Sequence, residues 1–126
     1  MKKILLSLLL LGSTHFISAN DKSKEEAKAL TTEKCSECHM IDSMTDTKGK
    51  NGHIKAPPMW GVMRKIHENF KTKDEVVAFL IDYTMNPSPE KMLFPKATEE
   101  YFGLMPSQKG KLTEAQLTII AEYLYN

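Results

Sequence analysis

Two cysteines in one short stretch, followed directly by a histidine, constrain this chain more than any other feature: Cys35-Ser36-Glu37-Cys38-His39. They are the only cysteines in the sequence. On a helix, residues three and four positions apart share a face, so Cys35, Cys38 and His39 would point the same way. The spacing is typical of covalent haem attachment, in which each thiol forms a thioether with a haem vinyl group and the histidine binds the iron. We therefore expect the rest of the chain to enclose a haem and to reach an oxidising compartment.

Two other kinds of site also use a pair of cysteines at this spacing, a thiol redox site and half of a zinc site. A zinc site usually needs a second pair of ligands, and the sequence offers no obvious one. A redox site does not require His39. The stretch therefore favours haem over both alternatives.

The first 19 residues have the pattern of a cleavable export signal. A basic start precedes an apolar run from Ile4 to Leu11, and Ala19 is a small residue suited to cleavage. The apolar run is too short for a bilayer, which needs about 20 apolar residues. We therefore expect residues 1–19 to be removed and residues 20–126 to form one periplasmic domain without a stable membrane anchor. A retained anchor is the alternative.

Residues 20–126 are close to neutral. The signal contains Lys2 and Lys3, which leaves 15 of the 17 basic residues against 16 acidic ones. Nucleic-acid-binding domains usually present a markedly basic face, so this balance argues against nucleic acid as a partner. A domain of this size has only a modest core, which a large apolar group such as haem would extend.

The apolar pattern predicts an all-α fold of about four helices. Three helices are expected to begin with a capping box, in which the side chains of two residues three positions apart bond each other's backbone N–H: Ser23–Glu26, Thr72–Glu75 and Thr113–Gln116. The first helix should end near Cys35 and deliver the cysteines to the haem. Another helix is predicted over residues 59–70, with Trp60 in the core.

Two segments lack helical periodicity and are predicted to be loops. Residues 40–58 are rich in polar residues and glycine, and residues 87–106 contain four of the six prolines. The second loop ends in an apolar cluster from Tyr101 to Pro106. We expect this end of the loop to be ordered and to face the haem.

The order of these features along the chain is that of a known family. An attachment motif, a proline segment after a loop, the pair Met105-Pro106 and a closing helix resemble the monohaem class I c-type cytochromes that bacteria export. The resemblance covers essentially all of residues 20–126. It implies a small helical bundle around one haem c, which Cys35 and Cys38 bind covalently. It also implies that His39 is the proximal iron ligand and Met105 the distal one.

The segment Ala56-Pro57-Pro58-Met59 resembles the Gly-Pro-x-Leu stretch of the same family. In that stretch, a proline carbonyl accepts a hydrogen bond from the second nitrogen of the proximal histidine. The resemblance therefore implies that Pro57 fixes the ring of His39 and makes it a stronger ligand. The chain departs from the family pattern by having Ala56 in place of glycine and a longer loop before it.

Other side chains could occupy the distal position instead of Met105. Met59 and Met63 follow an apolar helical stripe and are expected in the core. Met40 adjoins His39, which keeps it from the opposite haem face. The remaining alternatives are three methionines and two histidines: Met44, Met85, Met92, His53 and His67.

A methionine and a histidine fill both axial positions of the iron, which can then pass electrons but does not readily bind oxygen or peroxide. We therefore expect a monomeric one-electron carrier rather than an enzyme. Its donor would be a membrane quinol-oxidising complex or a dehydrogenase, and its acceptor a terminal oxidase, a reductase or a peroxidase. Four lysines flank the Met105 loop, with three glutamates among them: Lys91, Lys96, Lys109 and Lys111, and Glu90, Glu99 and Glu100. They form either an ordinary mixed surface or a lysine rim that steers the protein towards an acidic partner.

Two other functions remain open at the level of sequence. A haem-bearing subunit of a multiprotein periplasmic oxidoreductase would also transfer electrons, but it would have a stable partner. A gas-binding or sensing haem protein would need a vacant or labile distal position. The identity of the redox partners and the redox potential do not follow from the sequence.

Overall fold

The computed structural model describes residues 19–42 and 54–126. Residues 1–18, which make up nearly all of the predicted export signal, lie outside the described residues, and so do residues 43–53 with Met44 and His53. Within the described ranges the chain is helical, with no strand beyond an isolated bridge between Lys109 and Leu112. This confirms the predicted all-α fold. None of the described helices is long and apolar enough to cross a membrane.

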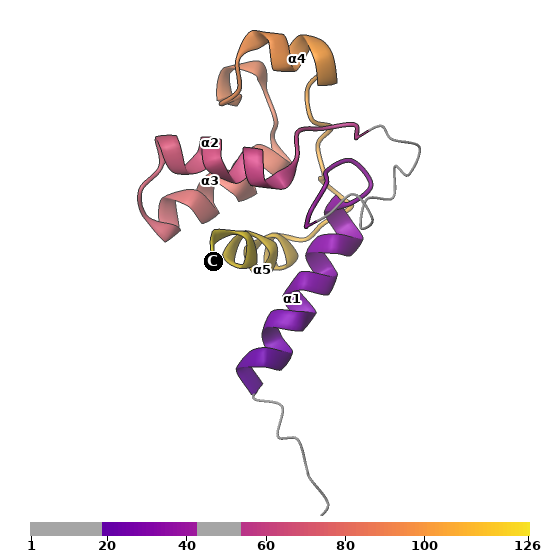
Figure 1. Cartoon of the computed structure of the whole chain (residues 1–126), viewed down its shortest axis with the longest axis vertical. Coiled ribbons are helices and arrows are strands. Elements are labelled where there is room, and N and C mark those ends of the chain that lie inside the picture. Colours follow the sequence, from indigo (N-terminus) through magenta and orange to yellow (C-terminus); the bar gives the residue numbers. More distant parts are fainter. Residues whose placement is uncertain (1–18, 43–53) are drawn as a thin grey trace, which may run out of the picture.

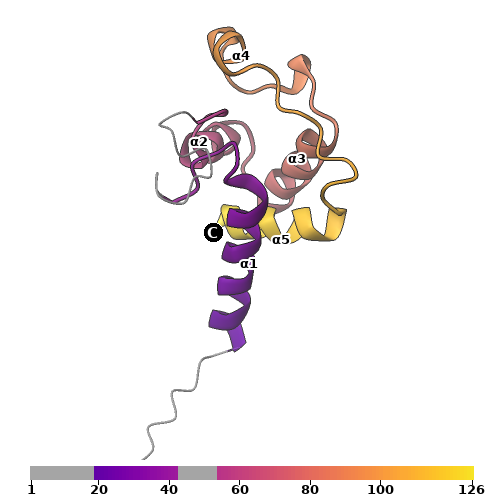
Figure 2. The same cartoon turned by 90° about the vertical axis from the view of Figure 1, so that its right-hand side faces the viewer.

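Five α-helices and one short 3-10 helix follow one another along the described chain: α1 (Ala19–Cys35), α2 (Met59–Asn69), α3 (Lys73–Met85), η2 (Pro89–Lys91), α4 (Lys96–Phe102) and α5 (Glu114–Tyr125). Helix α5 packs against both α1 and α3. Figures 1 and 2 show α4 at the opposite end of the molecule from α1, whose first half projects away from the other helices.

The buried apolar side chains form two clusters. One is built around α2 and contains Ile41, Met59, Met63, Ile66 and Val76. The other is built around α5 and contains Leu112, Leu117 and Ile120. Cys35 is partly buried and packs against both clusters. The end of α1 is therefore held where the two parts of the core meet.

Helices α3 and α5 begin with the predicted capping boxes. At α3, Thr72 Oγ1 accepts a hydrogen bond from the Glu75 amide at 3.3 Å, and the Glu75 carboxylate accepts one from the Thr72 amide at 3.0 Å. The backbone N–H groups of Thr72 and Lys71 hold the pKa of Glu75 below its usual range. Thr113 and Gln116 form the same pair of bonds at α5.

The capping box predicted at Ser23 is wrong. Helix α1 begins four residues earlier, at Ala19, and the Ser23 hydroxyl donates to the carbonyl of Asn20 at 2.9 Å inside the helix. No proline or glycine lies between Ala19 and Ser23 to stop the helix from starting earlier. The hydroxyl therefore bonds back along the helix instead of capping it.

Trp60 was predicted in the core, but 59% of its surface is exposed. The buried stripe of α2 is formed by Met59, Met63 and Ile66, and Trp60 lies beside this stripe rather than on it. The guanidinium of Arg64 lies 5.4 Å from the centre of the Trp60 ring, a cation–π contact at the surface.

The predicted loop from residue 87 to 106 contains a helix that the sequence pattern did not indicate. Helix α4 follows Pro95, which occupies its N-cap position. Proline is compatible with the start of a helix, because no intrahelical partner is needed for the missing N–H there. The proline that favoured a loop in this segment therefore marks a helix boundary.

We expect replacement of Thr72 by alanine to destabilise the protein by about 1 kcal/mol, because the N-terminus of α3 loses a side-chain acceptor. The change would be measured by denaturant unfolding. Thr118→Ala is the control, since its hydroxyl bonds only the Glu114 carbonyl of its own helix, at 3.0 Å. Alanine favours the interior of a helix, so this control should not destabilise. Equal decreases in the free energy of unfolding of the two variants would contradict the capping role of Thr72.

We expect Gly103→Ala to destabilise the turn that ends α4. Gly103 has φ 77° and ψ 178°, a conformation open essentially only to glycine, and another residue there costs about 1–3 kcal/mol. A Cβ at this position would meet no atom within 4 Å, so the loss would come from the backbone alone. Thermal unfolding measures the effect. Glu100→Ala, a change at an exposed position within α4, should leave the melting temperature unchanged. An unchanged melting temperature for Gly103→Ala would contradict the prediction.

Candidate functional site

The end of α1 carries the two cysteines and the histidine on a tight turn. The backbone N–H groups of Cys38 and His39 both donate to the carbonyl of Cys35, at 3.3 and 3.0 Å. Cys35 and Cys38 are free thiols and half-buried, and His39 is buried. The turn therefore presents two unbonded sulfurs and one imidazole within five residues of chain.

A second segment is hydrogen-bonded to this turn on both sides of His39. The amide of Lys55 donates to the carbonyl of Cys38 at 3.0 Å, and the amide of Met59 donates to the carbonyl of Met40 at 2.8 Å. The start of α2 is thus tied to the backbone that carries His39. These backbone bonds could not be predicted from the sequence pattern, because they join residues on opposite sides of a loop.

Between these two bonds, His39 Nδ1 donates to the carbonyl of Pro57 at 2.7 Å. A carbonyl oxygen can only accept, so Nδ1 carries the proton and Nε2 of the neutral ring has a free lone pair. Burial lowers the pKa of His39, while the bond to Pro57 opposes that shift. His39 is therefore held as a neutral ring with Nε2 available, which is the form that binds a metal.

The donor set fits a covalently bound haem. Burial, together with the neighbouring Cys38, raises the pKa of Cys35 to about 11, so its sulfur is a thiol rather than a thiolate at neutral pH. Addition of each S–H across a vinyl double bond would use up the thiol and leave a thioether. Among the described residues, no three or more histidines, cysteines and acidic groups gather to hold a metal ion by themselves.

Met105 belongs to a different segment of the chain. It is half-buried and lies between α4 and α5. In Figure 2 the chain between α4 and α5 runs on the side of α3, whereas the turn after α1 lies on the side of α2. The structure thus joins Cys35, Cys38, His39 and Pro57 through hydrogen bonds and one turn, whereas the chain segment that contains Met105 runs along a different side of the molecule.

The other candidates for the distal position have different surroundings. Met59 and Met63 are buried in the core, as predicted. His67 is exposed near the end of α2, and its ring lies 5.4 Å from the ring of Tyr125. Met85 packs against the cluster around α5.

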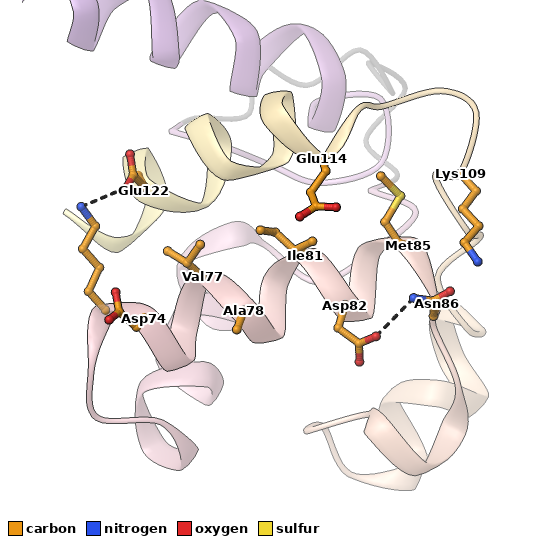
Figure 3. A pocket seen from close by; sticks show the side chains of 11 residues that line it. Asp74, Val77, Ala78, Ile81, Asp82, Met85, Asn86, Lys109, Glu114 and Glu122 are labelled. Carbon is orange, nitrogen blue, oxygen red and sulfur yellow. Dashed lines mark hydrogen bonds and ion pairs between the residues drawn. The ribbon is translucent and has the colours of Figure 1, made fainter.

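Two hollows in the described surface lie away from the cysteines and His39. One, of about 710 Å³, is lined by α3 and α5, with the apolar side chains of Val77 and Ile81 on its floor (Figure 3). Its rim is charged and includes the ion pair between Lys73 and Glu122 at 3.4 Å. The other, of about 770 Å³, is lined by α1 and α5. Neither is lined by Met105.

The chain is similar to known proteins over most of its length. The model of the cytochrome c family matches residues 24–126. An uncharacterized protein of Aquifex aeolicus is 29% identical over 137 aligned residues, which cover all of this chain and 88% of the relative. No solved structure matches. The chain therefore belongs to the cytochrome c family, whose haem c is bound covalently, here through Cys35 and Cys38.

Proposed function

We propose that this cytochrome c is an exported one-electron carrier whose haem iron is bound by Nε2 of His39 and by the sulfur of Met105. Proteins of the family generally act in electron transfer rather than catalysis. The observation that carries the proposal is the 2.7 Å bond between His39 Nδ1 and the Pro57 carbonyl. It supports a ring that is neutral, fixed in orientation and free at Nε2.

Haem c, when bound, supplies an iron that gains and loses one electron. The role of the protein is to keep the surroundings of that iron nearly constant. A ring held by Pro57 has little freedom to turn, and the burial of His39 keeps water from it. A methionine as the second ligand would raise the redox potential and leave no vacant position.

The segment around Met105 has the features expected of a ligand loop. Gly103 turns the chain at the end of α4, and Ser107 and Gln108 bond the end of α3. The competing side chains Met59 and Met63 are core residues. These observations support Met105 as the distal ligand.

The proposed carrier works in the periplasm after removal of residues 1–19, as a monomer. Members of the family are typically periplasmic or extracellular. A quinol-oxidising complex or a dehydrogenase would supply the electron, and a terminal oxidase, a reductase or a peroxidase would accept it. Of the four lysines in the proposed docking rim, Lys91 is already paired with Asp82 at 2.8 Å, whereas the other three, Lys96, Lys109 and Lys111, are exposed. The three exposed lysines are the better candidates for steering.

A second candidate function is a haem-bearing subunit of a multiprotein oxidoreductase. It is favoured by the exposure of Tyr101 and Leu104, at 81% and 37%, in the segment that leads to Met105. Exposed apolar side chains close together in sequence can mark a lasting interface. Size-exclusion chromatography of the holoprotein purified from its source distinguishes the two functions, because a carrier elutes alone and a subunit elutes with its partner.

We expect the ferric holoprotein to show the weak far-red absorption band of methionine-bound haem iron, and Met105→Ala to lose it. The control is Met92→Ala, which removes another half-buried methionine near η2 and should keep the band. An optical spectrum in both redox states is the measurement. Persistence of the band in Met105→Ala would contradict the ligand assignment. Carbon monoxide binding by the reduced wild-type protein at neutral pH would point to a gas-binding function instead.

We expect oxidation by the ferricyanide anion to slow as ionic strength rises, because the lysine rim attracts anions and salt screens it. The Debye length falls from about 30 Å at 0.01 M salt to about 8 Å at 0.15 M. In stopped-flow measurements at low salt, Lys96→Glu and Lys111→Glu should be slower than wild type, with the difference shrinking at high salt. Lys24→Glu, on α1, changes the net charge equally and is the control. If all three variants behave alike, the rim has no steering role.

A further inference from the structure

The C-terminal end of α3 is completed by a part of the chain that follows more than twenty residues later. The last carbonyls of a helix have no partner within it and must find one elsewhere. The Thr84 carbonyl accepts from the backbone N–H of Gln108 at 3.0 Å, and the Met85 carbonyl accepts from the Ser107 hydroxyl at 2.6 Å. Two successive residues of the Met105 segment thus bond two successive carbonyls of α3.

The Ser107 hydroxyl has a second bond, because it also accepts from the backbone N–H of Lys109 at 3.2 Å. Next to it, the Gln108 side-chain amide donates to the Pro106 carbonyl at 2.8 Å. The four residues from Pro106 to Lys109 are therefore linked to one another as well as to α3. Helix α3 is itself held by its packing on α5 and by Val76, which is completely buried. The segment is fixed to an element that has little freedom to move.

We propose that Ser107 is a positioning residue that holds the Met105 side chain at the haem iron, an inference that rests on the proposed role of Met105 as distal ligand. Gly103, two residues before Met105, has a backbone conformation that other residues avoid, and a Cβ at this position would meet no atom within 4 Å. Ser107, two residues after Met105, supplies the fixed end. Loss of its hydroxyl removes one of the two hydrogen bonds that join the segment to α3, so displacement of the methionine from the iron becomes easier.

Imidazole is a suitable probe, because it binds ferric haem iron by replacing a distal ligand. We would titrate the ferric holoproteins with imidazole at one neutral pH and follow the far-red band. Wild type is compared with Ser107→Ala, with Ser107→Thr, which keeps the hydroxyl, and with Ser23→Ala. Ser23 also donates to a backbone carbonyl, that of Asn20 at 2.9 Å, but on α1, so this control removes the same atoms and the same kind of bond.

We expect Ser107→Ala to bind imidazole roughly two- to fivefold more tightly than wild type, the effect of one solvent-exposed hydrogen bond of ordinary net strength. Ser107→Thr should stay near wild type, since Ser107 is exposed and has room for a methyl group. Ser23→Ala should be unchanged. Denaturant unfolding of each variant shows that the protein remains folded.

Each other outcome counts against the inference in a different way. If Met105→Ala loses the far-red band but Ser107→Ala binds imidazole as wild type does, Ser107 has no positioning role while Met105 remains the ligand. If Ser23→Ala tightens binding as much, or Ser107→Thr fails to restore it, the effect does not come from this hydroxyl. If wild type has no far-red band to lose, the assignment of Met105 fails, and the role of Ser107 fails with it.

Discussion

The hydrogen bond from His39 to the Pro57 carbonyl is the interaction on which the rest of the site depends. It decides which ring nitrogen carries the proton, and so which one can bind a metal. It also joins the end of α1 to the start of α2 across a loop of the chain. Without it, the ring could turn about its side-chain bonds, and the two thiols would be the only fixed points of the site.

The backbone around this bond is arranged to keep it in place. The bonds from Lys55 to Cys38 and from Met59 to Met40 lie on either side of it, so the two segments cannot slide past each other easily. Cys35 packs against both apolar clusters, which ties the covalent anchor of the haem to the whole core. The Met105 segment is fixed separately, through the end of α3. The protein therefore holds its two proposed iron ligands through two different groups of helices.

Much of this could be predicted from the sequence because the signals are local. The spacing of Cys35, Cys38 and His39 is set by haem chemistry, and the capping boxes at Thr72 and Thr113 are completed within four residues. The bond to Pro57 was implied only by family resemblance, since its partners lie 18 residues apart. Helix α4, the start of α1 and the exposure of Trp60 were missed. Helix α4 and the start of α1 depend on how prolines and polar residues behave at helix ends. The exposure of Trp60 depends on which side of α2 packs into the core.

The proton NMR spectrum of the reduced, diamagnetic holoprotein tests the two-ligand iron site most directly. The ring current of haem shifts the methyl group of a bound methionine far upfield, away from all other methyl signals. Binding through His39 and Met105 predicts one such methyl signal, assigned through the sequence to Met105. An upfield methyl assigned to another methionine, or the absence of any such signal, would contradict the site proposed for this cytochrome c.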